Sequence, residues 1–268
     1  MPPWAPFPGL PETGTLFLEA FGELTRDREK ARASADDQDL YSVFMTRAEL
    51  MGWSTTQGKS SSPRFAPVWE RPLLWGMNEA ELTEGTDTSC IGYVQVGLEE
   101  GVEAAMVLPA LSQCFDDSLR RFGRVDLSAL QVTAAFLPRA RPCAGNLISA
   151  LSWFHAGPKV PADAVIAVDY ELLRAGIESD FVASLQQMYT GPFVFGSLVD
   201  VPQQQSIDVR WGPAIHPGFG LSPARRGLSV TLPEWTASAA AWALALVIDE
   251  LRVASPEVRN FAARVTRV

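Results

Sequence analysis

The side chains best suited to acid–base chemistry in this sequence are its two histidines, because imidazole titrates near neutral pH. One of them, His216, lies in a Gly- and Pro-rich segment that also holds Arg225 and Arg226. Guanidinium groups bind carboxylates and phosphates through paired hydrogen bonds. An imidazole beside two such groups predicts proton transfer on an anionic substrate. The simpler interpretation is a tight loop whose arginines lie in solvent.

The second histidine, His155, follows an apolar stretch and precedes a Gly-Pro pair, so we expect it at the end of a strand, where functional side chains often gather. Asp169 and Glu171 follow the next expected strand and offer two carboxylates for acid–base work. A surface histidine and carboxylates that cap a helix are simpler interpretations. The candidate catalytic residues are therefore His216, His155 and Asp169.

Tryptophan and arginine occur together at two places in the chain. Trp69 and Arg71 lie in one segment with Trp75 nearby, and Trp211 opens the segment that holds His216. This combination suits an aromatic ligand, which it can contact by stacking and by cation–π attraction. It suits a protein interface equally well. We take Trp69, Arg71 and Trp211, with the two arginines already named, as candidate substrate-binding residues.

Cofactor and metal chemistry have no positive signal. The sequence contains no HExxH, GxSxG, Walker or dinucleotide-binding pattern. Gly58-Lys59-Ser60 resembles the end of a phosphate loop, but the first glycine and the preceding apolar strand are missing. The three cysteines are scattered without a CxxC pair, which favours reduced thiols over a zinc site. We expect no cofactor and no metal.

Composition limits the classes of partner. The chain of 268 residues is 47% hydrophobic and 20% charged, as is typical of a folded globular protein. Its net charge of -9 disfavours binding to nucleic acid or to an anionic membrane surface. The N-terminus lacks a signal-peptide pattern, and the apolar run 235–248 is too short to span a bilayer, which needs about 20 residues. We expect a cytoplasmic protein, and the abundance of Ala, Arg, Val and Pro indicates a bacterial source.

Strand and helix patterns alternate along the chain, and several strands are separated by hairpin-length gaps. This alternation predicts an α+β fold, with a mainly antiparallel sheet and helices packed on one face. Helical spacing predicts helices over 15–33, from Asp36 through Met51, and over 102–122. We expect Pro109 to kink or divide the last of these helices and Gly123 to cap it. A strand over 41–45 is the alternative to the second helix.

The other expected elements follow from apolar runs and turn residues. A helical stripe covers 173–188, and an Ala-rich helix covers 235–248. Acidic residues are expected in a solvated connector, namely Glu79, Glu81, Glu84 and Asp87. Strands are expected at 91–98, 129–137, 147–154, 164–168, 193–201, 206–211, 228–234 and 263–267.

A weak repeat relates two parts of the chain. Val96, Leu98 and Glu100 have the spacing of Val230, Leu232 and Glu234, and further matches lie downstream, at Leu119-Arg120 with Leu251-Arg252 and at Val132-Thr133 with Val265-Thr266. We interpret these matches as a duplication.

The repeat predicts a pseudo-dimer in which 91–137 and 226–268 superpose as βαβ units. The first half would cover 15–138 and the second 139–268, each similar to a ferredoxin-like or split βαβ unit. A Pro-rich arm, 1–14, would precede them.

Two functions remain open on these residues. The first is a cofactor-independent biosynthetic enzyme that performs a cyclisation, isomerisation or lyase-type step on a small anionic or aromatic metabolite. The second is a non-catalytic binding or assembly protein that uses its Pro-rich arm and its aromatic surface. We also expect a homodimer in which Pro2–Pro11 contributes Trp4 and Phe7 to the interface, because aromatic residues dominate interface energies.

Overall fold

The computed structural model describes most of the regular structure of the chain. The described residues are 14–26, 39–54, 75–83, 89–98, 104–135, 159–168, 178–188, 191–202, 205, 207, 226–254 and 261–268. They form four helices, α2 (Leu40–Leu50), α3 (Ala104–Leu119), α6 (Glu178–Met188) and α8 (Ala237–Ala254). The strands are β1 (Thr15–Arg26), β2 (Trp75–Leu82), β3 (Cys90–Leu98), β4 (Gly123–Ala135), β5 (Ala162–Val168), β6 (Val194–Asp200), β7 (Arg226–Leu232) and β8 (Phe261–Arg267).

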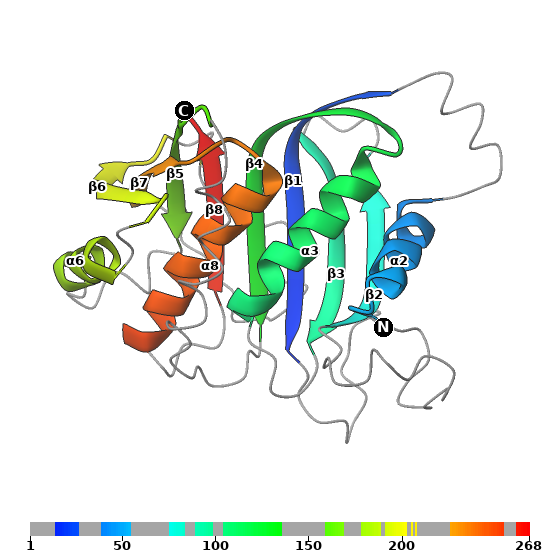
Figure 1. The fold of residues 1–268 in the computed structure, drawn as a ribbon, viewed down its shortest axis with the longest axis horizontal. Coiled ribbons are helices and arrows are strands. Elements are labelled where there is room, and N and C mark those ends of the chain that lie inside the picture. Colours follow the sequence, from blue (N-terminus) through cyan, green and yellow to red (C-terminus); the bar gives the residue numbers. More distant parts are fainter. Residues whose placement is uncertain are drawn as a thin grey trace.

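The eight described strands form one sheet in the order β2-β3-β1-β4-β8-β5-β7-β6 (Figure 1). Every pair of neighbouring strands in this order is antiparallel. The predicted α+β class with an antiparallel sheet is therefore confirmed. Among the described residues, the elements before and after the centre of the chain follow one order, strand-helix-strand-strand-helix-strand.

The two faces of the sheet differ in their side chains, as β1 illustrates. Leu16, Leu18 and Ala20 join the main hydrophobic cluster, which also holds apolar residues of all four helices. We call this side the core face. The alternate residues Phe17 and Glu19 point to the opposite side, which we call the polar face, since successive side chains of a strand alternate.

Helices α3 and α8 pack against each other across the core face (Figure 1). Ser112 Oγ of α3 donates a hydrogen bond of 2.9 Å to the carbonyl oxygen of Ala237, at the start of α8. The small alanine side chains of α8 are almost all buried, so the helix backbones can approach closely. Thr236 begins α8 by accepting a hydrogen bond from the backbone N–H of Ala239. The predicted Ala-rich buried helix is confirmed here, with an end several residues beyond its predicted one.

The predicted helix over 15–33 is wrong, because 15–26 form the central strand β1. β1 pairs with β3 on one side and with β4 on the other. A strand buried on both faces carries apolar residues at odd and even positions. Leu16, Phe17, Ala20 and Phe21 therefore have spacing that fits a helix as well.

Two further expectations concern helices in the first half. The predicted helix through Met51 is confirmed as α2, and Asp39 caps it by accepting a hydrogen bond of 2.8 Å from the backbone N–H of Ser42. The alternative strand over 41–45 is wrong. α3 continues through Pro109 as one element rather than two.

Gly123 begins β4 instead of capping α3, which ends at Leu119. A side chain at Gly123 would lie 2.2 Å from the carbonyl oxygen of Thr25 on β1, so the close approach of the two strands explains the glycine.

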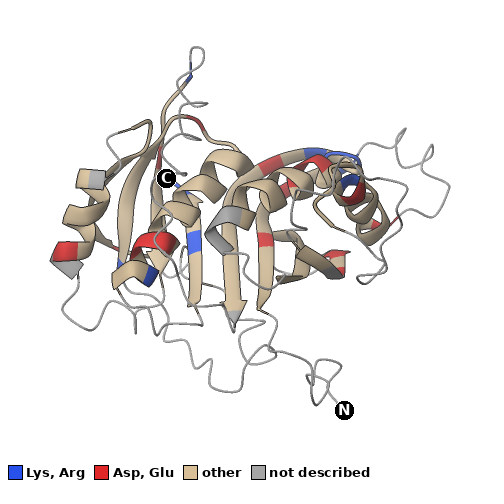
Figure 2. Cartoon of the chain, turned by 60° about the horizontal axis from the view of Figure 1, so that its bottom comes forward, with Lys and Arg blue, Asp and Glu red and all other residues tan. Residues whose placement is uncertain are grey.

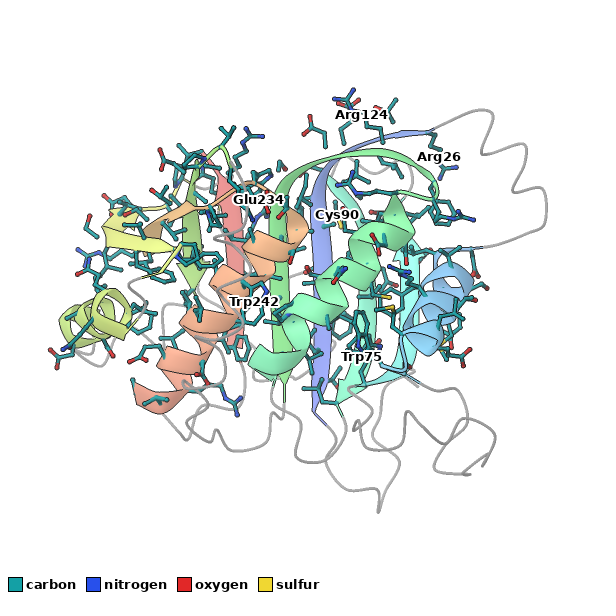
Figure 3. All side chains as sticks on the ribbon, viewed as in Figure 1. Arg26, Trp75, Cys90, Arg124, Glu234 and Trp242 are labelled. Carbon is teal, nitrogen blue, oxygen red and sulfur yellow. The ribbon has the colours of Figure 1, made fainter. Side chains whose placement is uncertain are left out.

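Trp75 belongs to the core, where it is fully buried at the start of β2 (Figure 3). Its ring lies 6.4 Å from that of Phe44 on α2 and 5.8 Å from that of Trp53. Trp75 therefore packs in the hydrophobic core, and its interpretation as part of a ligand-binding aromatic cluster is wrong. The N-terminal arm with Trp4 and Phe7 and the expected strand 147–154 lie outside the described residues, and so does nearly all of 206–211.

Candidate functional site

A row of polar side chains crosses the polar face of five neighbouring strands. Strand register places Glu81 of β2 opposite Tyr93 of β3, and Tyr93 opposite Glu19 of β1. Glu19 lies opposite Gln131 of β4, which in turn lies opposite Arg264 of β8. Directly opposed residues lie on one face and touch. We call these five residues the polar row.

Most of the polar row is buried. Glu19 and Gln131 have no exposed surface, and Tyr93 and Arg264 are nearly as deep, whereas Glu81 at the outermost described strand is exposed. Charged residues are otherwise sparse on the strands, which are mostly tan in Figure 2. Burying charged and amide groups costs free energy unless each is hydrogen-bonded. Placing these groups in the middle of the sheet therefore carries a cost in folding free energy that their hydrogen bonds must offset.

Hydrogen bonds join the members of the row. Gln131 Nε2 donates to Glu19 Oε2 at 2.6 Å, which links β4 to β1. The Tyr93 hydroxyl donates to Glu79 Oε1 at 2.9 Å and lies 3.2 Å from Glu81 Oε2. Two glutamates of β2 therefore converge on one phenol of β3.

The phenol of Tyr93 is held neutral by these surroundings. Burial, followed by the hydrogen bond and negative charge of Glu79, raises the pKa of Tyr93 far above its ordinary value of 10.0. A phenolate here would lose its hydration and face two carboxylates. Tyr93 can consequently donate a hydrogen bond at any physiological pH and cannot serve there as a base.

Aromatic rings flank the row on the same face. The ring of Phe17 is stacked with that of Tyr93, with 6.4 Å between centroids. The guanidinium carbon of Arg264 lies 4.0 Å from the centre of the Phe21 ring, a cation–π contact. The site thus combines carboxylates, amides and aromatic faces, the groups that recognise small polar ligands.

Two buried acceptor atoms near Tyr93 receive no hydrogen bond from any described residue. They are Gln95 Oε1 and Glu79 Oε2. Gln95 of β3 lies directly opposite Glu79 of β2, beside the pair formed by Glu81 and Tyr93. This corner of the row therefore has acceptors in excess of donors.

Metal and thiol chemistry find no support in the described part of the chain. No group of three or more His, Cys, Asp or Glu side chains there could hold a metal ion. Burial raises the pKa of the Cys114 thiol to about 12, so this cysteine stays protonated and is a poor nucleophile.

Of the eight site residues predicted from sequence, the structure describes one. Arg226 is the exposed first residue of β7 and lies opposite Asp200 of β6. The other seven lie outside the described residues, namely His216, His155, Asp169, Arg225, Arg71, Trp69 and Trp211, and their roles remain predictions.

Sequence reasoning missed Glu79 and Glu81, which we expected in a solvated connector. They lie instead on β2, where Ala80 between them points to the core face. The alternation of charged and apolar residues from Glu79 to Leu82 is a strand signal that could have been noticed. Tyr93, which lies 12 residues from Glu81 and shares a hydrogen bond with it, could not be identified as its partner without the strand register.

Comparisons with protein-family models, with curated protein sequences and with solved structures find no match for this chain. Within the described segments, every helix is too short or too polar to cross a membrane.

Proposed function

We propose that this chain binds a small molecule on the polar face of its sheet, at a site built by its first half. The observation that carries this proposal is the polar row, in which Glu19, Tyr93 and Gln131 occupy buried central positions. Apolar residues would stabilise such positions at lower cost. Natural proteins depart from local rules of this kind mainly at functional sites.

We further propose that the chain is a tandem repeat whose helices all pack on the core face. Strand pairing supports this proposal independently of the sequence matches. Leu16 lies opposite Val96 in the first half, and Ala164 lies opposite Val230 in the second. Two residues along, Leu18 lies opposite Val132, and Ile166 lies opposite Val265.

These strand pairings thus connect the first sequence match, Val96 with Val230, to the second, Val132 with Val265, by equivalent steps in the two halves. The same two successive strand registers link the matched residues in each half, which supports a common origin over chance identity. The sheet order supports the same conclusion, because it runs β4, β1, β3, β2 on one side of the centre and β8, β5, β7, β6 on the other.

The same correspondence supports a site in the first half alone. In this correspondence Ala167 takes the position of Glu19, and Gly227 takes the position of Tyr93. Ala167 lies opposite Gly227 and Arg264, as Glu19 lies opposite Tyr93 and Gln131. A side chain at Gly227 would lie 2.7 Å from a methyl group of Val201 and 2.8 Å from one of Val165. Apolar packing therefore fills the place that Tyr93 occupies in the first half.

An acid–base enzyme is the second proposal, and one observation favours it. Glu19, a fully buried carboxylate, lies on the strand position opposite Tyr93, a neutral phenol. A buried carboxylate can take up and release a proton, and a neutral phenol can donate a hydrogen bond to a developing negative charge. The enzyme acting on an anionic or aromatic metabolite, with His216 as its acid or base, therefore stays a proposal, as does the homodimer joined through Pro2–Pro11.

Binding can be tested with a thermal-shift screen of small metabolites grouped as cationic, anionic, aromatic and neutral. We expect one class to raise the melting temperature of the wild-type protein, because a ligand that binds only the folded state stabilises it. Tyr93→Phe should lose this shift. Thr231→Val is the matched control, because it removes a hydroxyl that donates to Asp163 in the second half. A shift of equal size in Tyr93→Phe, or no shift with any class, would contradict the proposal.

A further inference from the structure

We propose that the ligand carries a positively charged nitrogen group, an ammonium or a guanidinium, which Glu79, Glu81 and Gln95 hold on the polar face of β2 and β3. This inference rests on the binding function proposed above and specifies the chemistry of its ligand.

The first argument is the balance of charge around Tyr93. Glu79 Oε1 and Glu81 Oε2 lie 2.9 and 3.2 Å from the same hydroxyl. A phenol has one proton and can satisfy only one carboxylate at a time. Two carboxylates that approach one hydroxyl repel each other, and a positive charge beside both would offset this repulsion. Among the described residues, neither glutamate forms an ion pair with a basic side chain.

The second argument is independent of the acidic pair and comes from Gln95. Only 7% of its surface is exposed, and its Oε1 atom accepts no hydrogen bond from a described residue. Leaving a buried polar atom unsatisfied costs about 1–3 kcal/mol. Side chains directly opposite on one sheet face have Cβ atoms about 4.5–5.5 Å apart, so Gln95 lies beside Glu79, whose Oε2 is also buried and unsatisfied.

A cationic nitrogen supplies the hydrogen-bond donors that these acceptors lack. An ammonium has three donors and a guanidinium has five, and neither has an acceptor. The stacked rings of Phe17 and Tyr93 add aromatic surface beside the same acceptors, since Phe17 lies opposite Gln95. Aromatic surface of this kind attracts organic cations.

Access and ligand number favour an organic cation over a metal ion. Glu81 is exposed on the outermost described strand, whereas Gln95 is buried, so the acceptors run from solvent into the protein. Only two carboxylates converge here, and the described chain has no set of three side chains able to hold a metal. Calcium usually takes about 6–8 oxygen ligands, far more than two carboxylates supply, whereas magnesium can bind through one or two carboxylates and is therefore tested directly.

Isothermal titration calorimetry with agmatine, putrescine and ethanolamine tests the inference. We expect at least one of these cations to bind the wild-type protein, and Glu81→Gln and Glu79→Gln to weaken its binding at least tenfold. Glu23→Gln is the matched control, because it removes one exposed carboxylate from β1 and leaves the site intact. Glu81 is exposed, so Glu81→Gln should fold even if Glu79→Gln does not, and circular dichroism reports this.

Three results would overturn the inference. The first is equal affinity in Glu81→Gln and Glu23→Gln, and the second is no binding of any of the three cations. The third is binding of magnesium that depends on Glu79 and Glu81 in place of the organic cation. If an anionic or neutral metabolite instead shifts the melting temperature in a Tyr93-dependent manner, the charge assignment fails while the binding function stands. If the whole metabolite screen is silent as well, the binding function fails too.

Discussion

At the scale of single residues, Tyr93 illustrates how surroundings decide chemistry. The same phenol in water would ionise near pH 10, but on β3 it is buried against Glu79 and Glu81. Its neutral form is therefore favoured by desolvation and by two negative neighbours. Tyr93 acts in this fold as a hydrogen-bond donor that organises the glutamates of β2.

The raised pKa of Tyr93 predicts a loss of stability at alkaline pH. Above pH 10 the unfolded chain releases this proton, whereas the folded chain retains it, so the free energy of unfolding falls as the pH rises. Tyr93→Phe should remove this part of the decline. Ultraviolet titration of the native protein should give the same tyrosinate absorbance for wild type and Tyr93→Phe up to pH 11. An extra ionisation in native wild type between pH 10 and 11 would refute the assignment.

At the scale of elements, the central strand β1 depends on one local irregularity. Its pairing with β4 shifts register between Phe21 and Gly22, and Gly22 has a positive φ of 143°. A side chain there would lie 2.1 Å from the carbonyl oxygen of Asp126. Glycine at this β-bulge thus keeps the residues on either side facing the correct side of the sheet.

We expect Gly22→Ala to lower the free energy of unfolding by about 1–3 kcal/mol, through strain at φ above zero and the clash with β4. Gly191→Ala is the control, because no atom lies within 4 Å of the added methyl group. Urea unfolding of both variants provides the measurement. Comparable stability of the two would mean that the bulge tolerates a side chain.

At the scale of the whole molecule, the two halves share one continuous sheet. β4 pairs with β8 at its centre, and α3 packs against α8 over the same junction. Separating the halves would expose the edges of two central strands and much of the apolar surface of α8. The chain is therefore expected to fold as a single unit rather than as two domains.

This arrangement predicts one cooperative unfolding transition. Tryptophan fluorescence and far-ultraviolet circular dichroism should give coincident curves in urea, as two-state unfolding requires. Weakening the junction by Ser112→Ala, which removes the hydrogen bond to Ala237, should lower the midpoint without splitting the curve, with a loss of about 1 kcal/mol. Separate transitions for the two probes would show that the halves unfold independently.

Much of the fold can be predicted from the sequence, because the patterns that indicate its helices and strands are local. Helix α2 follows from an apolar stripe with a capping aspartate nearby, and α8 follows from an Ala-rich run. The matches of Val96 with Val230 and of Val132 with Val265 are the sequence signal behind the proposed repeat, because equivalent strands would keep equivalent core positions. The antiparallel α+β class follows from the alternation and short gaps of these elements.

Other features depend on contacts between distant segments, and the tertiary structure alone decides them. β1 resembled a helix because it is buried on both faces of the sheet, so apolar side chains occur at odd and even positions. Glu79 and Glu81 resembled surface charges until the register of β2 on β3 brought them to Tyr93. A one-residue slip would turn all of these side chains to the opposite face. Local sequence thus determined which segments form strands and helices, whereas long-range pairing determined which polar groups meet.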